Sequence, residues 1–78
     1  MIKTNKLKGR MKELGITQKL AADVLDIDPA TFNKKLNGRD GSVFTVTEAN
    51  EFANLLKLSA LEKSEYFFND KLAYKQED

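Results

Sequence analysis

The fold is decided by residues 17–38, TQKLAADVLDIDPATFNKKLNG, which predict two helices joined by a very short link. Thr17 is a good N-cap for a helix over residues 18–25, because its hydroxyl can accept a hydrogen bond from a backbone N–H that lacks a partner within the helix. The apolar residues of this helix predict one broad buried side: Leu20, Ala21, Val24 and Leu25.

The second helix of the pair has clear boundaries. Asp28 is a suitable N-cap, and Pro29 suits the first helical position, where a missing N–H costs nothing. Ile27 before the cap and Phe32 at the fourth helical position form a hydrophobic staple. Asn37-Gly38 ends the helix, since glycine readily adopts the left-handed conformation that often follows a helix. We therefore expect a helix over residues 28–37.

The link around Asp26-Ile27 is so short that the two helices must cross steeply, as in a helix-turn-helix. The second helix would then protrude and could enter a DNA major groove about 12 Å wide. At 100° per residue, Phe32 and Leu36 define its buried side. The residues expected opposite are Ala30, Lys34 and Asn37, with Thr31 and Asn33 on the flanks. This outward face is small, polar and basic, and residues 30–39 contain no acid.

Working outward, the flanks predict three further helices. Thr4 or Asn5 can cap a first helix that ends near Leu14, before Gly15. Residues 39–46 read as an extended loop with Phe44 and Val46 turned inward. A fourth helix is expected from a Thr47 cap, with one apolar face: Ala49, Phe52, Ala53 and Leu56.

Ser59 and Glu62 form a capping box that opens a fifth helix. Its expected core face carries Leu61, Phe68 and Leu72, and its other side carries Tyr66 and Phe67. Residues 70–78 are expected to fray. The sequence thus predicts an all-α, compact five-helix fold in a single domain over residues 1–78.

The composition excludes several classes of protein. The chain has no cysteine and no histidine, so disulfide scaffolds, thiol nucleophiles and Cys/His metal sites are ruled out. A calcium loop from Asp26 would need glycine at 31 and glutamate at 37, where the chain has Thr31 and Asn37. The remaining carboxylates suit caps and solvated faces. We expect no enzyme, no cofactor and no metal, and no membrane span or signal-peptide core is evident.

The net charge of +1 hides a strong asymmetry. Residues 1–39 hold nine basic and four acidic side chains, whereas residues 40–78 hold four and eight. Such polarity favours an anionic partner for the N-terminal half, although an uneven solvated surface would look the same.

Residues 17–38 resemble the helix-turn-helix of the lambda repressor and Cro family (Xre type). The features shared are Thr17-Gln18 opening the first helix, the small Ala22, apolar Ile27 and Phe32, and the Asn37-Gly38 close. The flanks are similar too, and the ending EYFF resembles small phage and prophage regulators of Gram-positive bacteria. Two positions depart from the family: Asp26 stands where glycine is usual in the turn, and Lys35 stands where an apolar residue is common.

The resemblance implies a role for each exposed position. DNA-base reading is implied for Gln18, Pro29, Ala30, Thr31, Asn33 and Lys34. Phosphate contacts are implied for Lys19, Lys35, Asn37 and Arg39. The implied protein is a cytoplasmic repressor in a bacterial host cell that binds an operator as a homodimer, with no small-molecule ligand.

A protein-binding role, as an antitoxin or antirepressor on the same fold, is the competing reading. Tyr66, Phe67 and Phe68 cannot all face one core from a single helix. Either the fifth helix lies in a groove that covers both sides, or Tyr66 and Phe67 form a dimer contact. We expect the dimer contact, because two-fold operators require one.

Overall fold

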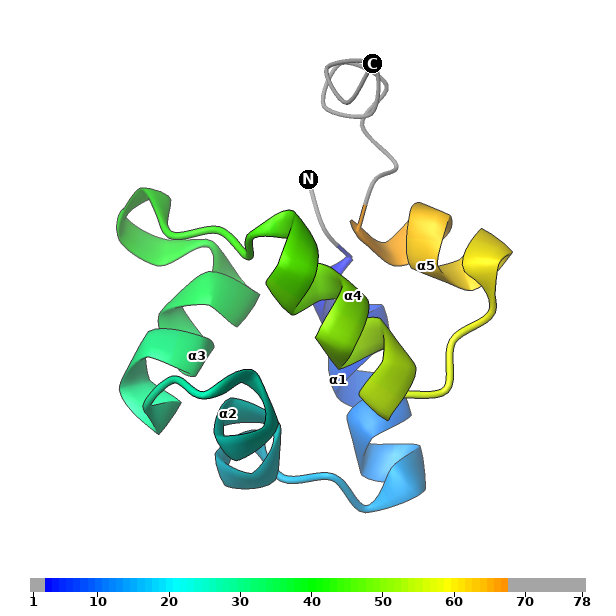
Figure 1. Cartoon of the computed structure of the whole chain (residues 1–78), viewed down its shortest axis with the longest axis horizontal. Coiled ribbons are helices and arrows are strands. Elements are labelled where there is room, and N and C mark those ends of the chain that lie inside the picture. Colours follow the sequence, from blue (N-terminus) through cyan, green and yellow to red (C-terminus); the bar gives the residue numbers. More distant parts are fainter. Residues whose placement is uncertain (1–2, 68–78) are drawn as a thin grey trace.

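The computed structural model describes residues 3–67, which form five α-helices and one 3₁₀ turn and contain no strand (Figure 1). The elements in chain order are α1 (Thr4–Leu14), α2 (Gln18–Leu25), α3 (Pro29–Asn37), η1 (Arg39–Gly41), α4 (Val46–Leu55) and α5 (Ala60–Phe67). In Figure 1, α4 runs through the middle of the molecule, with α2 and α3 to one side of it and α5 to the other. The prediction of a compact all-α fold is confirmed.

The helix ends follow the local sequence closely. The Thr17 hydroxyl accepts a hydrogen bond from the Leu20 N–H at 3.0 Å, and Asp28 accepts one from the Thr31 N–H at 2.8 Å. Ser59 and Glu62 exchange backbone and side-chain hydrogen bonds of 2.9 and 3.1 Å, which completes the predicted capping box. These caps satisfy backbone donors that the helices leave unpaired, so the predicted starts of α2, α3 and α5 are confirmed.

Two predicted helix starts were wrong. Lys3 is the N-cap residue of α1, and the Thr4 hydroxyl instead donates 2.8 Å to the carbonyl oxygen of Leu36, which fixes the start of α1 beside the end of α3. The α4 helix is capped by Thr45 and not by Thr47, because Glu48 three residues after Thr45 completes a reciprocal capping box. A 3₁₀ turn also occupies the first three residues of the expected extended loop.

The core of residues 3–67 is built around aromatic rings. Phe32, Phe44, Phe52 and Phe67 stack edge to face or tilted, with ring centroids 5.2–6.2 Å apart. The other buried residues are Leu7, Met11, Ala21, Ala22, Leu25, Leu36, Ala49, Ala53 and Leu56. Phe44 is partly buried against this core, as expected for its loop.

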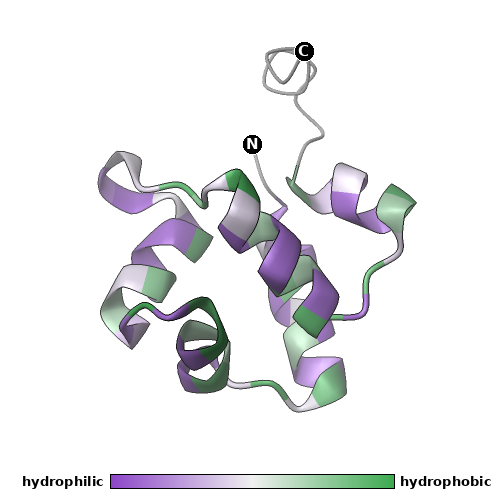
Figure 2. Cartoon of the chain, viewed as in Figure 1, coloured by the Kyte–Doolittle hydropathy of each residue, from purple (hydrophilic) through white to green (hydrophobic). Residues whose placement is uncertain are grey.

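Three apolar positions predicted to face inward are exposed. On α2, Leu20 and Val24 are 45% and 44% exposed, since the small Ala21 and Ala22 face the neighbouring helices and let them approach closely. Figure 2 shows the hydrophobic residues of α2 in green. Val46, the first residue of α4, is also exposed, at 47%.

The phase predicted for α5 was wrong as well. Leu61 is 80% exposed, whereas Phe67 is buried and packs against Phe44 and Phe52. The predicted partners Phe68 and Leu72, and the tail from residue 70, lie outside the described residues. The Phe67 ring is larger than the Leu61 side chain and packs next to the other phenylalanines. It therefore determines which side of α5 faces the core.

The turn between α2 and α3 consists of only three residues, and Asp26 adopts a left-handed conformation in it, with φ of 61°. Its N–H donates to the carbonyl groups of the preceding helix. Glycine adopts this conformation without strain, whereas a side chain there costs about 1 kcal/mol or more.

We expect Asp26→Gly to raise the free energy of unfolding by roughly 0.5 kcal/mol, because relief of the left-handed strain exceeds the added chain entropy of glycine. Urea denaturation measures the change. Asp23→Gly, in the exposed interior of α2, is the matched control and should destabilise by about 0.5–1 kcal/mol. Equal losses in the two variants would show that Asp26 is not strained.

Candidate nucleic-acid interface

The α3 helix presents one polar face to solvent, in the phase that the sequence predicts. Phe32 and Leu36 are fully buried. The exposed residues of the helix are Pro29, Ala30, Lys34 and Asn37, and the partly exposed ones at its flanks are Thr31 and Asn33. An exposed helix face with a small tip and with amide and ammonium groups along it has the chemistry to contact base edges.

Asn33 lies at the centre of a hydrogen-bonded cluster on this face. Its Nδ2 donates to the Oε1 of Gln18 at 3.0 Å, and its Oδ1 accepts from the guanidinium of Arg39. Its backbone oxygen accepts from the Nδ2 of Asn37 at 2.9 Å. The structure therefore brings together four of the predicted site residues from α2, α3 and η1.

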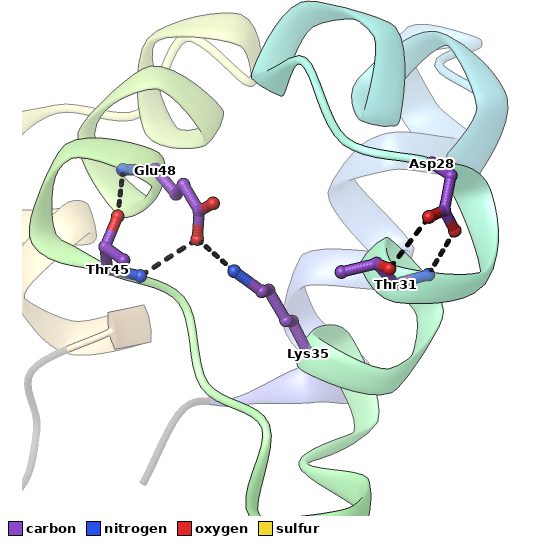
Figure 3. Close-up of polar contacts among 5 residues, drawn as sticks. All are labelled: Asp28, Thr31, Lys35, Thr45 and Glu48. Atoms are coloured by element: carbon purple, nitrogen blue, oxygen red, sulfur yellow. Dashed lines mark hydrogen bonds and ion pairs between the residues drawn. The ribbon is translucent and has the colours of Figure 1, made fainter.

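Asp28 and Thr31 form a second polar unit, at the tip of α3 (Figure 3). The Thr31 hydroxyl donates to Oδ2 of Asp28 at 3.0 Å, and the Thr31 N–H donates to Oδ1. These two hydrogen bonds, the backbone one first, hold the pKa of Asp28 below its ordinary value. The Asp28 carboxylate therefore accepts hydrogen bonds from the first turn of its own helix, as the capping pattern predicts.

Lys35 belongs to the fold and not to the exposed face. Its Nζ donates to Oε1 of Glu48 at 2.7 Å, and both side chains are only 17% exposed (Figure 3). Burial alone raises the pKa of Glu48, but the hydrogen bonds from Lys35 and from the Thr45 N–H outweigh burial and lower it. This ion pair argues against the phosphate role predicted for Lys35, since its ammonium already has a carboxylate partner.

This pair also explains how a lysine is accommodated at a largely buried position of α3. The Lys35 stem lies along the packed edge of α3, and the ammonium end meets Glu48 on α4. No sequence pattern indicates this pairing, because the two residues are 13 positions apart and Glu48 matches the pattern of a capping residue.

The other two predicted lysines have loose, exposed partners. Lys34 lies 4.0 Å from Asp40, and Lys19 lies 3.9 Å from Asp23 on its own helix. Exposed pairs of this kind contribute only about 0–1 kcal/mol, so both lysines can exchange their carboxylates for another anion. Asp40 was not recognised from the sequence, because its approach to Lys34 depends on the turn of η1.

The charge asymmetry has a definite place in the structure. Across residues 17–41 the four basic side chains (Lys19, Lys34, Lys35 and Arg39) are matched by four acids (Asp23, Asp26, Asp28 and Asp40). The excess is carried by α1 and the residue before it, where Lys3, Lys6, Lys8, Arg10 and Lys12 oppose Glu13 alone. The Thr4–Leu36 hydrogen bond places the start of this basic helix beside the end of α3.

The predicted dimer contact is corrected at Phe67. This side chain is 5% exposed within a single chain and is committed to the core. Tyr66 is partly exposed; its carbonyl oxygen accepts from the Lys3 N–H at 2.8 Å, and the Lys6 ammonium lies 6.0 Å from its ring. Of the two residues, only Tyr66 reaches the surface.

Within residues 3–67 no group of acidic side chains could hold a metal ion, and no helix there is long and apolar enough to cross a membrane. Comparisons with protein-family models, curated proteins and solved structures found no significant match to this chain.

Proposed function

We propose that this protein is a sequence-specific DNA-binding regulator that inserts α3 into the major groove, in the manner of the Cro-like repressors its sequence resembles. The observation that carries the proposal is the exposed face of α3. It follows α2 after three residues, contains no acid from Ala30 to Asn37, and is rimmed by the Gln18–Asn33–Arg39 cluster.

The chemistry of the face divides along the helix. Pro29 and Ala30, at the tip, have no side-chain donor and suit apolar contact with a thymine methyl group. Lys34, a turn further on, can donate to acceptors such as O6 and N7 of guanine. The Thr31 hydroxyl donates its hydrogen bond to Asp28, so toward DNA it can only accept one. Readout with so few free donors gives a modestly specific reader.

Repression would follow from steric exclusion of polymerase by a homodimer on a two-fold operator in the cytoplasm of a bacterial host. Lys19, Lys34 and Arg39 would contact phosphates or bases, and the basic α1 beside the end of α3 would strengthen the attraction to the duplex.

Binding-site selection from random duplex DNA tests the proposal. We expect enrichment of a two-fold sequence with half-sites about 34 Å apart, one helical turn. Ala30→Glu should abolish the enrichment, because it places a carboxylate against the groove. Ala60→Glu is the matched control, an exposed alanine at the start of α5, and should bind as the parent does. No enriched sequence would overturn the proposal.

A protein partner is the second candidate, and exposed apolar side chains favour it. Leu20 and Val24 lie one turn apart on α2, and Val43 and Val46 flank the start of α4. An antitoxin or antirepressor would use such residues. Failure of the DNA selection together with loss of a co-purifying protein in Val24→Glu would support this role.

A further inference from the structure

The cluster around Asn33 has a fixed direction of hydrogen bonding. A guanidinium can only donate, so Arg39 forces the Asn33 amide to turn its oxygen toward it. The nitrogen of the same amide must then point the other way, where it donates to Oε1 of Gln18. One obligate donor thus sets the orientation of two amides in series.

The last amide of the series presents a donor. With Oε1 of Gln18 occupied by Asn33, its Nε2 lies on the opposite branch of the amide, and no acceptor among residues 3–67 contacts it. Gln18 is partly exposed at the start of α2, next to the outer face of α3. Its two free N–H groups suit a hydrogen-bond acceptor on a bound ligand.

The arrangement also leaves Asn33 a poor base reader. An asparagine that recognises adenine must donate with Nδ2 and accept with Oδ1 at the same time. In this structure Nδ2 already contacts Gln18 and Oδ1 already contacts Arg39. The amide keeps one N–H and one lone pair, but rotating it to face a base would break both hydrogen bonds and release both neighbours.

We propose that Arg39 and Asn33 together orient the Gln18 side-chain amide so that its Nε2 donates to an acceptor on DNA. We call this chain of hydrogen bonds the relay. In this role Asn33 is a positioning residue and not a base reader. The inference rests on the proposed function, because the acceptor is taken to be a phosphate oxygen or a base edge of the operator.

A double-mutant cycle on the selected operator tests the relay. Gln18→Ala and Asn33→Ala should each weaken binding about fivefold, the effect of one hydrogen bond. The double variant should bind within about twofold of either single one, because Asn33 acts through Gln18. The Gln18→Ala and Lys34→Ala pair is the control, and its effects should multiply, since no hydrogen bond joins these two side chains within residues 3–67. Multiplied effects for Gln18 and Asn33 would overturn the relay.

The coupling should also extend to Arg39, which does not contact Gln18. Arg39→Ala and Gln18→Ala should be non-additive in the parent and additive in the Asn33→Ala background. All variants should keep the parent melting temperature, because the cluster is at the surface. If Gln18→Ala lowers the affinity equally for all operator sequences, the acceptor is a phosphate. If the affinity falls only for one base pair at one position, the acceptor is a base edge.

A measurement without DNA separates the relay from the proposed function. In the free protein, Arg39→Ala should shift the side-chain amide resonances of Gln18 as well as those of Asn33, while Lys34→Ala should leave them unchanged. No shift at Gln18 would overturn the relay alone. A shift at Gln18 in a protein that enriches no DNA would overturn the proposed function and, with it, the role given to Gln18.

Discussion

Phe52→Ala is expected to lower the free energy of unfolding by about 3–5 kcal/mol. The Phe52 side chain is fully buried, and its ring lies 5.2 Å from Phe32, 5.5 Å from Phe44 and 5.8 Å from Phe67. Alanine would remove the ring that all three others contact. A domain of this size has a total stability of about 4–12 kcal/mol, so the variant would lose about a quarter of it or more.

Thermal unfolding followed by circular dichroism measures the effect. Each kcal/mol shifts the melting temperature of such a domain by about 4–8 °C, so Phe52→Ala should melt at least about 12 °C below the parent. Leu61→Ala is the control, because this side chain is 80% exposed. It should change the stability by less than about 0.5 kcal/mol. Similar melting temperatures for Phe52→Ala and the parent would contradict the four-ring core.

The sequence predicted the local features well because their causes are local. Thr17, Asp28 and Ser59 were identified as caps since each carries a short oxygen-bearing side chain at the right place before an apolar pattern. The phase of α3 followed from Phe32 and Leu36 alone. The start of α4 was missed by two residues, because Thr45 and Thr47 both look like caps and only the partner Glu48 selects between them.

The features that the sequence could not predict depend on neighbours from other elements. The apolar pattern of α2 predicts that Leu20 is a core residue, but Ala21 and Ala22 are the residues buried against the adjoining helices. Lys35 appeared to be a phosphate ligand, and only the packing of α3 against α4 shows that Glu48 holds it. The Gln18–Asn33–Arg39 relay spans α2, α3 and η1, so no pattern within one helix could have indicated it.

The contacts of each positively charged side chain determine whether it is free to bind an anion. Of the four predicted phosphate or base ligands with a positive charge, Lys35 is held at the packed edge of α3, and three remain exposed: Lys19, Lys34 and Arg39. The exposed three have either a loose carboxylate partner or, for Arg39, the neutral Asn33. The charge available to DNA from this face is therefore three per chain and not four.

Operator affinity is expected to fall steeply with salt, by an amount set by these three cations. Each phosphate neutralised contributes about −0.9 to the slope of log K against log salt. Three contacts give a slope of about −2.7 and a loss of about 40-fold between 50 and 200 mM salt, and two chains on one operator give about −5.4 and roughly 2,000-fold. The slope thus reports the number of chains bound as well as the presence of the contacts.

Two neighbouring lysines provide the matched test of this expectation. Lys34→Ala should reduce the magnitude of the slope by about 0.9 for each bound chain, because it removes one exposed cation. Lys35→Met should leave the slope unchanged, since the Lys35 ammonium is already paired with Glu48, and its effect should appear in the melting temperature. Fluorescence anisotropy of a labelled operator over 50–200 mM salt measures both variants beside the parent. An affinity that changes less than threefold over this range, or a slope that responds to Lys35→Met and not to Lys34→Ala, would exclude α3 as the DNA-contacting helix.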